Sequence, residues 1–240
     1  ASALYSSLLA NLLVSKPEKS SASSKGQFTV LTSNHEHYGA LDAFKCHKGY
    51  NIVYVSDECL HSMDKLCDQI KINKPQVMLL SNVCFDICLQ PPVEQIGQYL
   101  IENYPSIEER PIFIVDCAQS LGVVPTVPST ALGSGVAVVI GSAPKWLCGP
   151  QGLGLMWISD RVYELVSGFV GSSHPIDEST RRSEFEIAGG QNFSNYALLK
   201  ATLDLYRWIG PKQVYDVGAS LSKRFLSSVL SSFRNAGIDV

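Results

Sequence analysis

Short apolar runs rich in β-branched residues alternate with helix-like stretches along most of this 240-residue chain. Runs that are apolar at every position are typical of strands buried on both faces of a parallel sheet. Their alternation with helical patterns predicts an α/β fold in which helices cover both faces of a mostly parallel sheet. We expect strands at 28–32, 51–55, 76–81, 112–115, 136–140 and 154–158, and helices at 57–73, 92–104, 160–166, 195–209 and 211–235.

The two ends of the chain carry further local signals. An amphipathic pattern predicts a helix that begins at or just after Ser2, and the serine- and lysine-rich segment 15–26 is typical of a surface connection. The last four residues, Gly-Ile-Asp-Val, are typical of the beginning of a strand. We therefore expect one large domain over residues 1–210, followed by a connecting helix and the beginning of a smaller domain at 211–240.

Composition narrows the functional classes. Charged residues make up 17% of the chain, below the roughly 25% usual in soluble domains, so part of the surface is expected to be buried against another chain. The net charge of −3, without any Lys/Arg run, argues against a binder of nucleic acid or membrane surfaces. The apolar runs are far shorter than the ~20 residues of a membrane-spanning helix. Seven cysteines, an odd number, indicate reduced thiols and a cytoplasmic location, with an organellar signal upstream of Ala1 as the alternative.

Lys145 is the first candidate for chemistry. It lies between the apolar run 136–140 and a glycine-rich apolar stretch at 149–158. An ammonium is hard to solvate in such surroundings, which favours the neutral, nucleophilic amine that a Schiff-base lysine requires. The alternative interpretation is a loop lysine whose head group reaches water along its flexible stem.

Other polar residues follow neighbouring strands, at the edge where parallel sheets bind ligands. Asp116 follows the strand 112–115, and its carboxylate could keep the nitrogen of a pyridoxal ring protonated. Gln119 could bond the phenolic oxygen of such a ring, and His37 could lie on its face and assist proton movement. His35 and His37 could also be metal ligands, but no third ligand has suitable spacing, so no metal site is predicted.

Serines supply the candidate phosphate contacts. Ser142 precedes Lys145 by three residues, and Ser2 stands at the start of a predicted helix, where backbone N–H groups favour an anion. Each of these serines, taken alone, also fits an ordinary helix cap or turn.

Three ordered motifs carry a resemblance to a known family. They are Asn-His-Glu-His-Tyr-Gly at 34–39, Val-Asp-Cys-Ala-Gln-Ser-Leu-Gly at 115–122 and Ser-Ala-Pro-Lys-Trp-Leu-Cys-Gly-Pro-Gln-Gly at 142–152. The chain thereby resembles the class V aminotransferases, a group of fold-type I pyridoxal phosphate enzymes that includes cysteine desulfurases, cystine C–S lyases, kynureninases and isopenicillin N epimerases. The resemblance implies the large domain of a transferase-like fold, with the family's N-terminal arm and small C-terminal domain missing.

The resemblance also implies roles for individual residues. Lys145 would hold pyridoxal 5'-phosphate as the Schiff-base lysine, and His37, with His35 as the alternative, would stack on the ring. The segment Ala-Gly-Gly-Gln-Asn at 188–192 resembles a family loop that reaches the phosphate of the neighbouring subunit, with Gly190 in place of its threonine. The implied cofactor-binding residues are Lys145, Asp116, Gln119, His37, Ser142, Ser2, Ala3, Gly190 and Gln191.

The predicted function is that of an enzyme acting on an amino acid, of the C–S lyase, cysteine desulfurase or epimerase type, in a homodimer with the active site at the interface. An aminotransferase or a kynureninase-like hydrolase is the alternative within the family. A catalytically inactive homologue is another, because Gly190, Pro144 and Cys84 depart from the family pattern. A nicotinamide-binding domain is disfavoured because Gly133-Ser-Gly135 lacks a third glycine, and a serine hydrolase because no Gly-x-Ser-x-Gly occurs.

Overall fold

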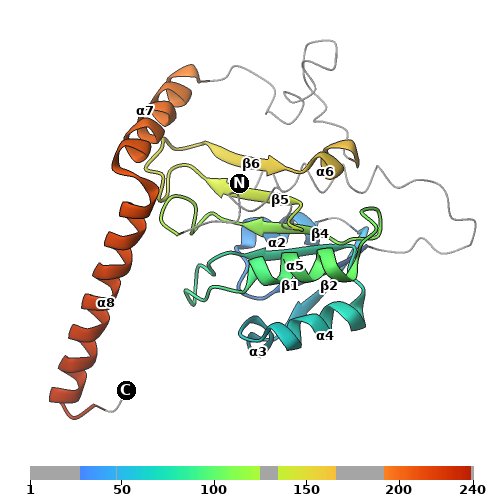
Figure 1. Cartoon of the computed structure of the whole chain (residues 1–240), viewed down its shortest axis with the longest axis horizontal. Helices are drawn as coiled ribbons and strands as arrows, with labels where there is room; N and C mark the ends of the chain where they lie inside the picture. The colour runs from blue at the N-terminus through green and yellow to red at the C-terminus, as the bar shows by residue number, and fades with distance from the viewer. Residues whose placement is uncertain (1–27, 47, 125–134, 166–191, 239–240) are drawn as a thin grey trace, which may run out of the picture.

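A computed structural model describes residues 28–46, 48–124, 135–165 and 192–238 of the chain (Figure 1). Within these ranges the strands form one six-stranded sheet of order β2-β1-β3-β4-β5-β6. Strands β1 to β5 pair in parallel with their neighbours, and β6 pairs antiparallel with β5. The strands are β1 (Phe28–Ser33), β2 (Tyr50–Val55), β3 (Val77–Ser81), β4 (Ile112–Asp116), β5 (Val138–Ser142) and β6 (Gly154–Ile158).

Helices cover both faces of this sheet. The core on one face includes side chains of α2 (Tyr38–Lys45) and α6 (Asp160–Leu165). The core on the other face includes side chains of α3 (Asp57–Leu60), α4 (Met63–Asn73) and α5 (Val93–Asn103). The predicted fold class, a mostly parallel sheet between helices, is confirmed.

Strand β3 explains why the apolar runs show no polar alternation. Val77 and Leu79 belong to one core, while Met78 and Leu80 belong to the other, and all four side chains are buried. Because successive strand residues point to opposite faces, a strand between two helical layers must be apolar throughout. Full burial of one such leucine contributes roughly 2 kcal/mol.

Three differences from the sequence-based prediction stand out, while several other elements begin or end one or two residues from the expected position. Helix α2 was not predicted, although its buried Ala40, Leu41, Ala43 and Phe44 have helical spacing. The helix predicted at 57–73 is divided, because Ser62 has extended backbone geometry and its side chain caps α4 by accepting from the N–H of Lys65. The fifth strand begins and ends two residues later than predicted, since its antiparallel partner pairs Gly154 with Ser142.

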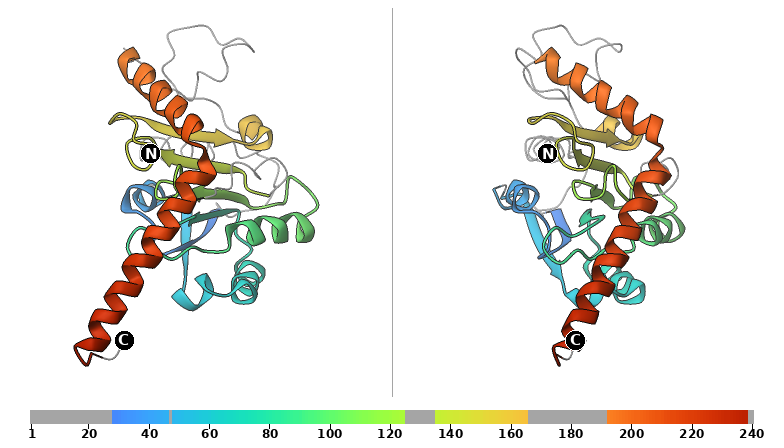
Figure 2. Two further views of the ribbon diagram at one scale, coloured as in Figure 1. Left: turned by 60° about the vertical axis from the view of Figure 1, so that its left-hand side comes forward. Right: turned by 90° about the vertical axis from the view of Figure 1, so that its left-hand side faces the viewer.

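The last two helices, α7 (Phe193–Ile209) and α8 (Pro211–Asn235), meet at Gly210, whose φ of 93° favours glycine. Figures 1 and 2 show α8 running from the β6 side of the sheet toward the β2 side. None of its 25 residues is buried. The domain boundary expected at residue 210 stays a prediction. Among the helices of the described ranges, none has the length and apolarity needed to cross a membrane.

Polar residues end the strands at the carboxyl edge of the sheet. Strands β1, β3, β4 and β5 end with Ser33, Ser81, Asp116 and Ser142, and parallel pairing brings these ends to one edge. Ser81 and Asp116 are directly paired in register. This edge is the place where α/β sheets of this kind bind ligands.

Candidate active site

Asp116 is fixed at the centre of the carboxyl edge. Its side chain is buried, and Oδ1 accepts a hydrogen bond of 2.7 Å from the backbone N–H of Ala118. Among the described residues, no donor bonds Oδ2. Asp116 therefore presents one carboxylate oxygen that can accept a hydrogen bond from a protonated ring nitrogen.

Glu36 is a second buried carboxyl group, which sequence reasoning missed. Its two oxygens accept hydrogen bonds from Ser33 Oγ at 2.8 Å and from Ser81 Oγ at 2.6 Å. Burial raises the pKa of Glu36 to about 7, the two serine hydrogen bonds oppose this rise, and the charge of Asp116 adds to it. The available signal was a glutamate placed three residues after a buried strand, between two histidines.

His37 begins helix α2 and is held in place from two directions. Its Nδ1 accepts a hydrogen bond of 3.1 Å from the backbone N–H of Gly39, as a capping side chain does. Its ring lies 4.0 Å from the ring of Tyr38 and 5.5 Å from that of Phe85, centroid to centroid. An imidazole with Nδ1 as acceptor carries its proton on Nε2 when neutral.

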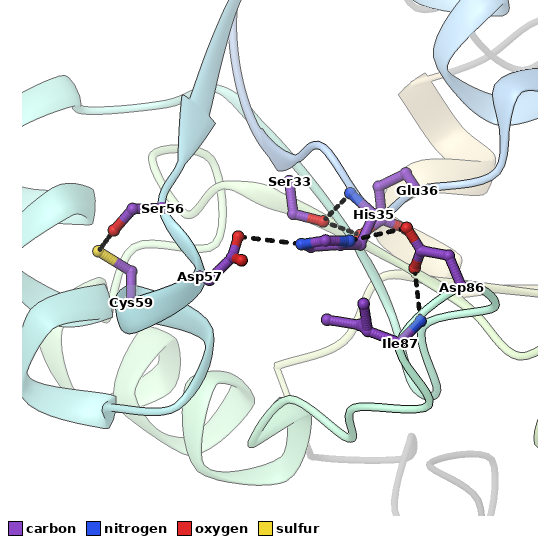
Figure 3. Close-up of polar contacts among 8 residues, drawn as sticks. All are labelled: Ser33, His35, Glu36, Ser56, Asp57, Cys59, Asp86 and Ile87. Carbon is purple, nitrogen blue, oxygen red and sulfur yellow. Dashed lines mark hydrogen bonds and ion pairs between the residues drawn. The ribbon is translucent and has the colours of Figure 1, made fainter.

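His35, the alternative stacking residue, is engaged elsewhere (Figure 3). Its Nδ1 lies 2.8 Å from Asp86 Oδ2, and its Nε2 lies 2.9 Å from Asp57 Oδ1. The hydrogen bond with Asp86, followed by that with Asp57, raises the pKa of His35 above its ordinary value. Both ring nitrogens are thus committed to carboxylates, which leaves His37 as the candidate for the ring face. No group of three potential metal ligands occurs within the residues that the structure describes.

Lys145 lies in a turn between β5 and β6, and the sequence-based expectation of an apolar environment is wrong. The side chain is exposed. The turn is closed by backbone hydrogen bonds from Cys148 to Lys145 and from Gly149 to Ala143. Ala143 and Leu147 are the buried anchors of this turn, so the lysine between them points outward.

The segment after Asp116 packs against the Lys145 turn. Gly122 has a φ of 101°, and a Cβ atom built on it would lie 2.9 Å from Leu147 Cδ2. A Cβ atom on Gly141 would lie 2.4 Å from Leu121 Cδ2. These close approaches bring the aspartate motif and the lysine motif together at one edge.

Of the remaining predicted site residues, the structure describes Gln119 and Ser142. Gln119 is half-buried in the turn that follows β4, which closes through hydrogen bonds from Ser120 and Leu121 to the carbonyl of Cys117. Ser142 is partly exposed at the end of β5. Ser2, Ala3, Gly190 and Gln191 lie outside the described residues.

The described residues fit a pyridoxal phosphate ring in their chemistry. The edge supplies a buried carboxylate with one oxygen that no described residue bonds, a flat imidazole, a serine hydroxyl and an exposed primary amine. These are the group types that would accept from a pyridine nitrogen, cover a ring, bond a phosphate and react with an aldehyde.

The family model for Aminotransferase class-V matches residues 10–236. The match extends over nearly the whole chain, and the chain therefore belongs to the Aminotransferase class-V family. No curated protein sequence matches the chain. Family membership confirms the resemblance drawn from the three motifs and supports pyridoxal phosphate as the cofactor.

Solved structures with the same fold include a cysteine desulfurase from Thermococcus onnurineus NA1, with a TM-score of 0.75 and 19% identity over 96% of this chain and 56% of that one. A cystine C–S lyase, C-DES, in complex with cysteine persulfide has a TM-score of 0.68 and 18% identity over 90% of this chain and 57% of that one. An alanine–glyoxylate aminotransferase from Nostoc sp. has a TM-score of 0.64 and 16% identity over 87% of this chain and 54% of that one. The chain spans just over half the length of these proteins.

Proposed function

We propose that the chain forms the cofactor-binding part of a pyridoxal phosphate-dependent enzyme that acts on an amino acid, with Lys145 as the Schiff-base lysine. The observation that carries this proposal is the packing of the Lys145 turn against the segment after Asp116, through Gly122 and Leu147. That packing supports the proposal, because it joins the turn that carries a primary amine to the segment that follows a buried carboxylate, and the chemistry uses both groups.

Each side chain at the edge has a distinct task in this proposal. Bound pyridoxal phosphate would supply an aldehyde and an electron-withdrawing ring. Asp116 would keep the ring nitrogen protonated, His37 would cover the ring, and Gln119 would bond its phenolic oxygen. Lys145 would hold the cofactor and move a proton at the α-carbon of the substrate. Ser142 would bind the phosphate, together with Ser2, Ala3, Gly190 and Gln191.

The reaction branch proposed is that of a C–S lyase, cysteine desulfurase or epimerase, on the basis of the Lys-Trp-Leu-Cys-Gly-Pro segment at 145–150. A transaminase or kynureninase-like hydrolase is the alternative within the family. A catalytically inactive member is a second candidate function, and the exposure of Lys145 favours it, because a well-solvated ammonium is a poor nucleophile.

A homodimer in the cytoplasm completes the proposal. Large apolar side chains are exposed along α7 and α8, among them Trp208 at 83% and Phe225 at 72%. Together with the low charge content, this pattern supports burial of that surface against a second copy. Sedimentation of the chain with pyridoxal phosphate tests the dimer, and a monomer at micromolar concentration contradicts it.

Borohydride trapping tests the role of Lys145. The chain is mixed with pyridoxal phosphate, reduced, digested and analysed by mass spectrometry, and we expect the cofactor on the peptide that contains Lys145. Lys145→Ala should abolish the adduct, while Lys71→Ala, at an exposed position of α4, should leave it unchanged. Labelling spread evenly over surface lysines would refute the proposal.

A further inference from the structure

Two buried carboxyl groups lie at the carboxyl edge of the sheet: Glu36 in the loop after β1, and Asp116 at the end of β4. Glu36 is bonded to Ser81 Oγ at 2.6 Å, and Ser81 is the register partner of Asp116. Glu36 is 2% exposed and Asp116 is 5% exposed. Burial is the main cause of the raised pKa of Glu36, and the charge of Asp116 adds to it, because ionised carboxylates in a region of low dielectric repel each other.

We propose that Glu36 is a positioning residue that acts through Asp116, and that it releases a proton when the positively charged ring of the cofactor binds beside Asp116. This inference rests on the proposed function, because it requires a cationic ring at that edge. It assigns to Glu36 a role in the charge balance of the site, without contact with the substrate.

The surroundings of Glu36 support this role. The serine hydroxyls of β1 and β3 donate to its oxygens and can stabilise the ionised form, as hydrogen bonds to a carboxylate do. Among the described residues, the titratable groups that interact with it electrostatically are Asp116 of β4 and Cys84, which follows β3. Burial raises the pKa of Cys84 to about 12, which keeps that thiol neutral. A positive charge placed beside Asp116 is therefore the compensation that would let Glu36 ionise.

The proton balance is simple. Before binding, the Glu36 carboxyl holds a proton in a fraction of molecules near neutral pH, because burial raises its pKa to about 7. When a ring that carries N–H⁺ occupies the edge, its positive charge favours the ionised form of Glu36. The proton of Glu36 is then released to solvent. Only the proton of Glu36 is exchanged in this step.

Calorimetry in two buffers with different ionisation enthalpies measures the proton count. Pyridoxal phosphate is titrated at pH 7 into the wild-type chain and Glu36→Gln. We expect wild type to release about half a proton more per site than Glu36→Gln, since a group near its pKa is half-protonated. At pH 8 the variant should bind the cofactor roughly threefold to tenfold more weakly. Glu102→Gln, at an exposed position of α5, is the matched control and should behave as wild type.

A second variant keeps the inference testable if Glu36→Gln does not fold. Ser81→Ala removes a donor to Glu36 and should move the pH of greatest proton release upward. Equal proton counts for wild type and Glu36→Gln, or an unmoved maximum in Ser81→Ala, would overturn the role of Glu36 while leaving the proposed function intact. Failure of the wild-type chain to bind pyridoxal phosphate would reject both.

Discussion

His35 Nδ1 and Asp86 Oδ2 lie 2.8 Å apart, and this pair joins the loop after β1 to the loop after β3. Phe85 directly precedes Asp86, and its ring contacts the ring of His37. The ion pair thus holds one wall of the candidate ring site. Because the opposite nitrogen of His35 faces Asp57, the arrangement favours a protonated imidazole that donates to both carboxylates.

Replacing Asp86 with asparagine should return the pKa of His35 toward its ordinary value, since Asp86 is the largest cause of its rise. Because the pKa of His35 is raised, the interaction stabilises the fold fully below about pH 6.5, the unfolded-state pKa. This stabilisation is lost as the pH rises through the folded-state pKa. We expect Asp86→Asn to lower the free energy of unfolding by about 1 kcal/mol at pH 6, and by less at pH 9. NMR titration of the imidazole and urea unfolding measure the two effects. Asp64→Asn, on α4, is the control, and an unchanged His35 titration in Asp86→Asn would contradict the prediction.

Glu36 should make the stability of the cofactor-free chain depend on pH in the opposite sense to an ordinary carboxylate. Its pKa is raised from 4.5 to about 7, so its favourable contribution is present below pH 4.5 and is lost as the pH rises through 7. We expect the free energy of unfolding of wild type, relative to Glu36→Gln, to fall by about 2 to 3 kcal/mol between pH 4.5 and pH 8. Urea midpoints measured across this range test the prediction. Parallel pH profiles for the two proteins would show that Glu36 titrates normally.

Gly122→Ala should disturb the Lys145 turn, because the new Cβ would lie 2.9 Å from Leu147 Cδ2 at a backbone φ of 101°. Gly152→Ala is a matched control, since Gly152 also has a positive φ, of 85°, but nothing lies within 4 Å of its Cβ position. Both variants should lose about 1 to 2 kcal/mol from the backbone conformation. Only Gly122→Ala should also weaken cofactor uptake, followed by absorbance. Equal cofactor uptake by the two variants would contradict the prediction, because it would show that the Gly122–Leu147 contact does not affect cofactor binding.

Asp116→Asn should preserve the turn, because the amide oxygen can still accept from Ala118, but it removes the charge beside the ring nitrogen. We expect the pKa of the bound ring nitrogen to fall by about 1 to 3 units, the usual effect of losing a neighbouring opposite charge. NMR of the cofactor labelled with nitrogen-15 reports this protonation directly. A fully protonated ring in Asp116→Asn would mean that another group supplies the charge. Glu102→Asn serves as the surface control.

The sheet was predictable because strands buried on both faces are apolar at every consecutive position, and such runs can be recognised in the sequence. Val77 to Leu80 are apolar without interruption, and the structure buries them in alternation on two faces. Local capping decided what the pattern could not: Ser62 divides α3 from α4, although the apolar spacing continues across it. Helix α2 is short, and it begins directly after the polar segment that ends with His37. Because that segment was interpreted as part of a ligand site, the helical spacing of the residues after it was overlooked.

The candidate site was predictable in its motifs and less so in its environment. Asp116 has the buried position at a strand end that the apolar run before it indicated. The exposure of Lys145 depends on how a turn between β5 and β6 is closed, and flanking apolar residues do not encode the direction of a turn. The buried position of Glu36 depends on a hydrogen bond from Ser81, which is 45 residues away in the sequence. A contact over that separation exists only once the strands are assembled.

The absence of buried side chains in α8 has a consequence for how the molecule opens. A helix that contributes little to a packed core gains little from the cooperativity of that core, whereas the strands at its centre are released only on global unfolding. Beyond the glycine elbow at Gly210, backbone amides of α8 should therefore exchange with solvent through local fluctuations, while those of β4 report the stability of the whole sheet. In the absence of a second copy covering α8, we therefore expect two regions of different local stability, one on each side of Gly210.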